Sequence, residues 1–193
     1  MKRLLLRMLT VLGILILVAS TIFLMARPSA KEKAQRIMDK QIPEAIRFVL
    51  ENENKLNVIQ ELQSRLDGIG YLIQQQANDD VSIHVSTHTA NEVKLGPKQS
   101  FAEYPDISGI EKDTIYEILS AMPTGNRVMG VGPDGIYFTR NTNFGFNLTY
   151  TNTVTLVITN NQKSAFSLND AEDSYYEQIN DHWFLGIYYW QND

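Results

Sequence analysis

Apolar and polar residues follow one another in three different patterns along this chain of 193 residues. An uncharged apolar run from Met8 to Ala26 comes first, a stretch with helical spacing follows it, and alternating patterns typical of strands dominate the remainder. These patterns predict a membrane anchor at residues 1–27, a helical stalk at residues 28–53 and a soluble α+β domain at residues 54–193.

The apolar run contains 19 residues without a charged side chain. As a helix with a rise of about 1.5 Å per residue it would span roughly 28 Å, close to the thickness of the hydrocarbon core of a bilayer. We therefore predict that Met8 to Ala26 bind the lipid bilayer. A cleaved signal peptide is the alternative and would make the domain secreted, although its apolar region is usually only about 7–15 residues long.

Charge is distributed unevenly between the two ends of the chain. Residues 1–36 contain seven basic side chains and one acidic side chain, and since the total net charge is −5, residues 37–193 carry a net charge of −11. An acidic domain repels phosphate backbones, so no nucleic-acid partner is expected. Basic residues flank the apolar run on both sides, but the N-terminal tail is short. This favours a single-pass protein of the cell membrane with an extracytoplasmic domain.

Three helices are predicted after the anchor. In residues 30–52 a broken apolar stripe contains Pro43, which predicts two short helices or one kinked helix. Residues 55–76 show a stronger apolar seam, and we expect this amphipathic helix to pack on the domain's own sheet. Ser108 and Glu111 have the spacing of a capping box at the start of a third helix. The seam of the second helix consists of Ile59, Leu62, Leu66, Ile69 and Ile73.

The remaining patterns predict strands. Residues 81–85 alternate between apolar and polar side chains, as a half-buried strand does. The last strand, residues 182–190, is apolar on both faces, so we expect it to lie inside the sheet or to be covered on its second face. A tight join at Thr151 and Asn152 suggests a hairpin. Further strands are predicted at residues 92–95, 128–131, 136–140, 144–151 and 153–160.

Helices that precede a mainly antiparallel β-meander predict an α+β fold. The order of elements is analogous to that of cystatin-like and NTF2-like folds, in which a long helix lies across a curved sheet. The analogy rests on element order alone, and no motif accompanies it.

Two motifs that could carry chemistry fit ordinary structure better. Residues 130–135 match G-x-G-x-x-G, but a strand pattern follows them instead of the helix that a dinucleotide site needs. We interpret Pro133 to Gly135 as a turn between two strands. His84 and His88 would lie about 13 Å apart on a strand, which is too far for them to share a metal ion.

The chain has no cysteine, which excludes disulfides, thiolate catalysis and cysteine metal sites. Asp170, Glu172 and Asp173 form an acidic group without the spacing of a calcium-binding loop, and we expect a solvated loop or helix start there. No catalytic, cofactor-binding or metal-binding residue is therefore predicted.

Aromatic residues crowd into the C-terminal part of the chain. Large aromatic side chains usually fill the core, but a strand with two apolar faces can leave one of them to a partner. We therefore predict a candidate interaction surface. It consists of Tyr176, Trp183, Phe184, Tyr188 and Trp190.

The sequence leaves three functions open. We expect a membrane-tethered, non-enzymatic domain that binds a protein or a small ligand and exposes an aromatic patch. The alternative is an NTF2-like small-molecule-binding or enzymatic domain with His84, Asp181 or His182 in a cleft. The third is a structural subunit of a membrane assembly. A type IV pilin has a similar outline of helix and sheet, but its glycine cleavage site and its acidic residue near the start of the apolar run are missing here.

Overall fold

The computed structural model describes residues 28–75, 80–89, 92–122, 127–144, 152–165 and 171–191. The predicted anchor, the join at Thr151 and the acidic residue Asp170 lie outside this part of the chain. Among the helices of the described residues, none combines the length and the apolar character that crossing a bilayer requires. The predicted α+β class is confirmed, because helices pack on an antiparallel sheet of eight strands.

Two capping boxes define where two of the helices begin. Helix α2 (Ala30–Glu51) starts at Ser29, whose hydroxyl accepts the backbone N–H of Glu32 at 3.1 Å while the Glu32 carboxylate accepts the N–H of Ser29. Pro43 lies inside α2, which remains one continuous helix. Helix α4 (Gly109–Ala121) begins at Ser108 with the predicted capping box. Each such cap contributes about 1 kcal/mol to helix stability.

The second predicted helix is much shorter than expected. Helix α3 (Glu53–Ser64) ends before Ile69 and Ile73, which belong instead to strand β1 (Ile69–Gln75). Gly68, three residues beyond the C-cap Arg65, has a φ of 65°, a left-handed conformation that glycine adopts without strain immediately before β1 begins. Ile69 and Ile73 fit both a helical seam and a strand of period two, and pairing of β1 on both of its sides decides for the strand.

All eight strands form one sheet, and every neighbouring pair is antiparallel. The strands after β1 are β2 (Val81–Thr89), β3 (Glu92–Ser100), β4 (Arg127–Gly132), β5 (Gly135–Phe144), β6 (Asn152–Thr159), β7 (Asp173–Gln178) and β8 (Phe184–Gln191). Their order across the sheet is β3-β2-β1-β4-β5-β6-β8-β7, so β1 pairs with β4 although two other strands and a helix come between them in the chain.

Three strand predictions need correction. Strand β5 runs unbroken through the predicted gap between residues 140 and 144, and it pairs directly with β6 from Phe144 opposite Asn152. The predicted strand 144–151 therefore contributes only its first residue to β5, and residues 145–151 lie outside the described part. Asp173 begins strand β7 instead of a solvated loop or helix, because pairing with β8 provides backbone hydrogen bonds that the local sequence does not reveal.

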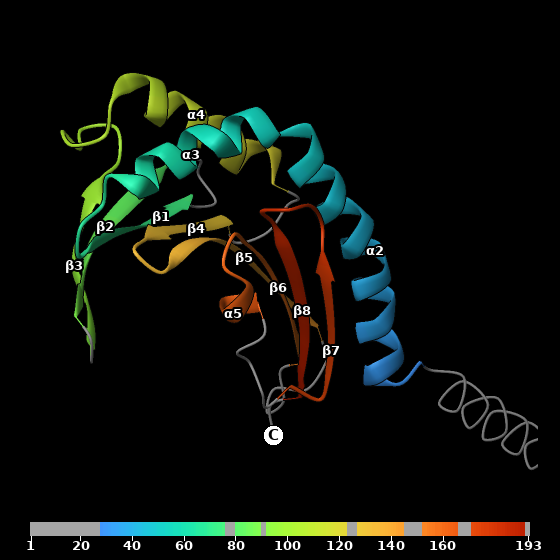
Figure 1. Cartoon of the computed structure of the whole chain (residues 1–193). Helices are drawn as coiled ribbons and strands as arrows, with labels where there is room; N and C mark the ends of the chain where they lie inside the picture. The colour runs from blue at the N-terminus through green and yellow to red at the C-terminus, as the bar shows by residue number, and fades with distance from the viewer. Residues whose placement is uncertain are drawn as a thin grey trace, which may run out of the picture.

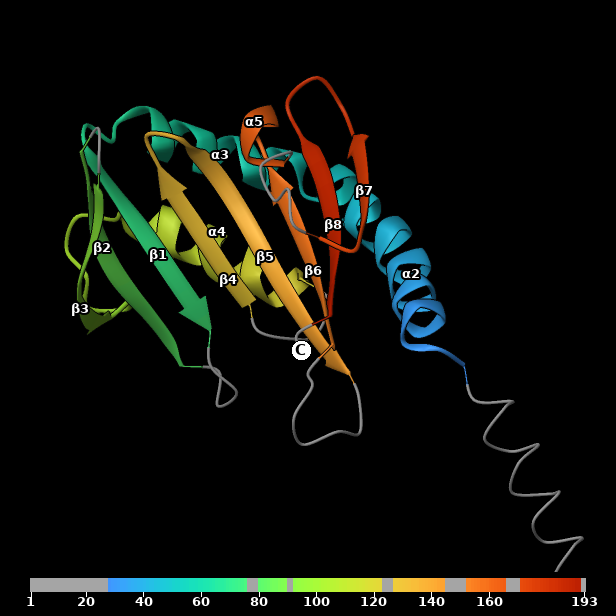
Figure 2. The ribbon, with the colours of Figure 1, turned by 90° about the horizontal axis from the view of Figure 1, so that it is seen from below.

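The helices cover one face of the sheet, which we call the helix face (Figure 1). Helices α2, α3 and α4 lie along it, while the short helix α5 (Gln162–Ala165) lies on the opposite face, which we call the open face. Figure 2 looks toward the open face, with the strands in front of the three longer helices. Helix α2 packs against β6 and β8, so residues of the predicted stalk contribute to the core.

The core lies between the helices and the helix face. Ile115, Ile118 and Leu119 of α4 are fully buried there, and burial of each such side chain stabilises the fold by about 1.5–3 kcal/mol. Phe138 of β5 contacts Phe48 of α2 edge to face, with ring centroids 5.7 Å apart. The helices therefore bury the apolar side chains of the helix face, and the open face does not contribute to this core.

Candidate functional site

The structure divides the predicted aromatic surface between the two faces of the sheet. Strand β8 lies between β6 and β7, so the predicted position inside the sheet is confirmed. Trp183 is buried in the core on the helix side, with its ring centroid 6.0 Å from that of Phe138. Tyr188 belongs to the open face and is also buried, with 0% of its surface exposed.

Tyr188 forms an aromatic cluster with two neighbours on the open face. Its ring centroid lies 5.5 Å from that of Tyr176 and 6.3 Å from that of Trp190, and α5 packs against β6 and β8 beside it. Burial, followed by the hydrogen bond with Tyr176, raises the pKa of Tyr188 above the ordinary tyrosine value. Tyr176, Phe184 and Trp190 keep intermediate exposure, so the rim of this cluster reaches solvent while its centre does not.

The residues of the alternative cleft are not brought together. His84 lies on β2, where its Nδ1 is 3.1 Å from the carbonyl oxygen of Gly96 in β3. Asp181 and His182 are exposed in the turn between β7 and β8. Strands β1, β4, β5 and β6 lie between β2 and β8 in the sheet, which at about 4.8 Å per strand places the two groups roughly 20 Å or more apart.

Three glycines instead form a hollow in the other half of the open face. Gly70 of β1 and Gly130 and Gly132 of β4 occupy positions where a side chain would project from this face. A Cβ atom on Gly130 would lie 1.9 Å from Cζ of Tyr137, so the Tyr137 ring rests directly on the glycine backbone. Glycine weakens a strand, and it commonly marks a place where another group approaches the backbone closely.

His88 lies in the space that Gly70 and Gly132 leave free. A Cβ atom on Gly70 would lie 2.8 Å from Nε2 of His88 and 2.9 Å from Oγ of Ser86, and one on Gly132 would lie 3.4 Å from Nε2 of His88. Ser86 is opposite Gly70 in the register of β1 and β2. The missing side chains therefore allow the imidazole ring to lie across the sheet.

Ser86, His88 and Asp134 form a polar chain in this hollow. The Ser86 Oγ lies 2.9 Å from Nε2 of His88, and the other ring nitrogen, Nδ1, lies 3.5 Å from Oδ2 of Asp134. At 3.5 Å the second contact is longer than an ordinary hydrogen bond, and Nδ1 is buried without a hydrogen-bond partner among the described residues. Ser86 is 5% exposed, whereas the Asp134 side chain is 84% exposed at the mouth of the hollow.

The turn that carries Asp134 is held by side chains from α3 and the end of β6. Gln63 donates to the carbonyl oxygen of Gly132 at 3.2 Å, and Asn160 donates to Gln63 at 2.8 Å. Asn161 donates to the backbone carbonyl of Asp134. These bonds fix the backbone of the turn and leave the Asp134 carboxylate directed toward solvent and His88.

The hollow encloses a cavity of about 90 Å³. It is lined in part by Ser86, His88, Asp134 and Tyr137, so a hydroxyl, an imidazole, a carboxylate and a phenol meet around a small space. A tyrosine hydroxyl is protonated at neutral pH, and burial raises the pKa of Tyr137 further, so this hydroxyl is available as a hydrogen-bond donor. A site with these groups and a glycine floor can bind a small polar or carbonyl-containing molecule.

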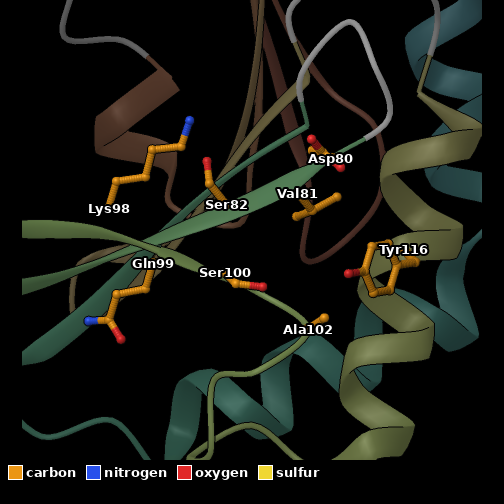
Figure 3. Close-up of a pocket in the computed structure, with 8 residues that line it drawn as sticks. All are labelled: Asp80, Val81, Ser82, Lys98, Gln99, Ser100, Ala102 and Tyr116. Atoms are coloured by element: carbon orange, nitrogen blue, oxygen red, sulfur yellow. The ribbon is translucent and has the colours of Figure 1, made fainter.

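A second, larger recess lies at the edge of the sheet between β2, β3 and α4 (Figure 3). It has a volume of about 520 Å³ and is open to solvent. Lys98 and Gln99 leave β3 in opposite directions, and Tyr116 reaches toward the recess from α4. These polar groups do not converge on one point, so the recess is a weaker candidate than the hollow around His88.

Among the described residues, no group of three or more histidine and acidic side chains is placed to bind a metal ion. The chain matches no protein-family model, no curated protein and no solved structure.

Sequence reasoning missed this site although it singled out some of its residues. It interpreted Pro133 to Gly135 as a turn, and the turn is confirmed between β4 and β5, where Gly135 has a φ of 135°. That interpretation does not explain Gly130 and Gly132, which lie within β4. The signal was the occurrence of glycines at alternate positions of a strand, and only the register of β1 with β4 shows that Gly70 is adjacent to them.

Proposed function

We propose that this chain is a membrane-anchored protein whose extracytoplasmic domain binds a small molecule in the glycine-floored hollow of its open face. The observation that carries the proposal is the cavity bounded by Ser86, His88 and Tyr137. The glycines make room on the open face for the rings of Tyr137 and His88, and the cavity lies beside these two rings. A small cavity with a polar lining is suited to a ligand that can form hydrogen bonds with these groups.

The membrane part of the proposal rests on the uncharged run from Met8 to Ala26, whose length suits one span. The analogy of element order with cystatin-like and NTF2-like folds is compatible with a binding role and assigns no residue. Binding of a protein through the exposed rims of Tyr176, Phe184 and Trp190 stays a prediction.

Ligand binding can be tested by a nuclear magnetic resonance screen of the full chain in detergent with a library of small carbonyl and hydroxyl compounds. We expect binding compounds to shift the amide signals of Gly70, Gly130 and Gly132 more than those of the edge recess. The Gly70→Ala variant should lose these shifts, because its methyl group would collide with His88 and Ser86. Gly109→Ala is the matched control, since a methyl group there meets no atom within 4 Å. Shifts confined to the edge recess would disprove the assigned site.

The location can be tested with single cysteines, because the natural chain has none. Ser120→Cys places a thiol on the exposed side of α4, and we expect a membrane-impermeant thiol reagent to label it in intact cells. Ile115→Cys, at a fully buried position of the same helix, should stay unlabelled until the protein is denatured. Labelling of Ser120→Cys only after lysis would place the domain on the cytoplasmic side.

A further inference from the structure

We propose that Ser86 is a nucleophile activated by His88, and that the hollow transfers short acyl groups from activated esters to water. This inference deepens the proposed function, because it rests on the same hollow and names the class of molecule that would react there. It adds a chemical step that simple ligand binding does not require.

The first support is the order of the three polar groups. A nucleophilic serine requires a base in contact with its hydroxyl, and that base requires a group on its far side to orient it. Here Nε2 of His88 contacts Ser86 at 2.9 Å and Nδ1 faces Asp134 at 3.5 Å. A carboxylate beside Nδ1 favours a proton on that nitrogen, which leaves Nε2 free to accept the Ser86 hydroxyl proton.

The second support comes from a comparison of two similar serines on β2, of which only one contacts a histidine. Ser82 and Ser86 lie on the same strand, face the same side and are similarly buried, with 4% and 5% of their surfaces exposed. The Ser82 hydroxyl lies 3.4 Å from the backbone carbonyl of Gln74, a weak contact with an acceptor that cannot remove its proton during a reaction. Of the two, Ser86 alone has an imidazole nitrogen at hydrogen-bond distance.

The third support is the size of the space. A cavity of about 90 Å³ suits an acetyl or similarly short acyl group and excludes a long acyl chain from its interior. Asp134 and Tyr137 border the same cavity, and Tyr137 is 39% exposed, so a leaving group can extend past it toward solvent. The protonated hydroxyl of Tyr137 can donate a hydrogen bond to the acyl oxygen as it gains negative charge.

The reaction balances without any further reactant. As Ser86 Oγ forms a bond to the acyl carbon, the hydroxyl proton moves to Nε2 of His88. The bond between the acyl carbon and the ester oxygen then breaks, and His88 returns the proton to the departing alcohol. In the second half the oxygen of a water molecule forms a bond to the acyl carbon while His88 takes one of its protons. The bond between the acyl carbon and Ser86 Oγ then breaks, His88 returns the proton to Oγ, and the products are a carboxylic acid and regenerated Ser86.

The test uses the full chain in detergent with p-nitrophenyl acetate, and it measures release of nitrophenol and the mass of the intact protein. We expect acetylation on Ser86, located by peptide mass spectrometry. A fluorophosphonate probe, which reacts with activated serines, should label the same residue. Ser86→Ala should abolish both signals, while Ser82→Ala, the matched control, should leave them unchanged.

Variants of the other two groups separate chemistry from structure. His88→Gln keeps a polar side chain but removes the base, and the rate should fall about 100-fold. Asp134 is a positioning residue, so Asp134→Asn should lower the rate by about 10-fold and Asp134→Glu should restore most of it. A purely structural role of Asp134 would give equal rates in the two variants once both are shown to be folded by circular dichroism.

Two results would overturn the inference. One is a folded wild-type chain that neither releases nitrophenol above the rate of Ser86→Ala nor reacts with the fluorophosphonate. The other is equal labelling of Ser82 and Ser86. If either occurs while small molecules still shift the amides of the glycine floor, binding stands and acyl transfer fails. If those amides also remain unshifted, both proposals fail.

Discussion

The two halves of the open face differ in how side chains fill the space above the sheet. In the half formed by β6, β8 and β7, Tyr188 is fully buried between other aromatic rings beside α5. In the half formed by β2, β1, β4 and the start of β5, glycines replace large side chains and leave a hollow around His88. One half of the face is filled and the other is opened, although both belong to one continuous sheet.

In the aromatic half the side chains stabilise the fold, whereas in the other half the glycine positions reduce its stability. A buried aromatic ring removes a large apolar area from water, whereas a glycine in a strand contributes no packing and loses more conformational entropy on folding. The aromatic half therefore acts as a second, smaller core. The glycine half has a cost in stability that the helix-face core offsets, and under the proposed function this cost would be linked to ligand access.

The largest expected loss of stability follows from a substitution in the filled half. Tyr188→Ala should lower the free energy of unfolding by about 3–5 kcal/mol, because it removes a fully buried ring and leaves a cavity. Urea unfolding followed by circular dichroism measures this loss. Tyr137→Ala, at a partly exposed position of the opened half, should cost only about 1 kcal/mol. Equal losses for the two variants would mean that the halves do not differ in packing.

A smaller loss of stability is expected when a side chain is added to the opened half. Gly70→Ala should lower the free energy of unfolding by about 1–3 kcal/mol, because the added methyl group must displace His88, Ser86 and the carbonyl of Val131. Gly109→Ala should change it by less than about 0.5 kcal/mol, since the space around that position is empty. If Gly70→Ala were instead stabilising, the hollow would be an unfilled defect of packing and not a site.

The smallest expected effect appears at alkaline pH. Burial raises the pKa of Tyr188 in the folded state, so the unfolded chain loses the hydroxyl proton first as the pH rises through about 10. The fold is therefore unaffected by this group below a pH of about 10 and loses stability above it. Tyr188→Phe should reduce that loss, measured as the urea midpoint at increasing pH, and Tyr137→Phe should reduce it less because its ring is partly exposed. An identical pH dependence of wild type and Tyr188→Phe would contradict the assignment.

Local pattern predicted the elements whose ends carry their own chemical signals. Ser108 begins a helix as predicted, because a hydroxyl and a glutamate three residues later satisfy the free N–H groups, and the structure shows the same arrangement at Ser29, where the predicted first helix begins. Strand β2 was predicted from strict alternation, and the turn after β4 was predicted from its residue types. The predictions were wrong where two periods fit the same residues, as at Ile69 and Ile73, or where pairing with a distant strand decided the structure, as at Asp173.

The site could not be predicted in the same way. The sequence contains Ser86, His88 and Asp134, but the histidine pair and the glycine motif each had an ordinary explanation in a single strand or turn. The three polar groups meet because β1 pairs with β2 on one side and with β4 on the other. Strands β2 and β3 and helix α4 come between β1 and β4 in the chain, so no local pattern or spacing connects the two strands.

The register of that pairing completes the site. Val131 lies opposite Tyr71, which brings Gly132 and the turn that follows it next to Gly70 and His88. A shift of one residue would exchange the two faces of β4 and move Gly132 away from the hollow.

The sequence by itself determined the α+β class, the starts of two helices and the apolar run that suits a membrane span, because each of these depends on neighbours a few residues apart. Only the tertiary structure decided which strands are neighbours, which aromatic rings are buried and which polar groups meet. The physical reason is that a side chain of a strand has its closest contacts across the sheet. Its environment is therefore set by register with distant segments, as Gly70, Ser86 and Gly132 show.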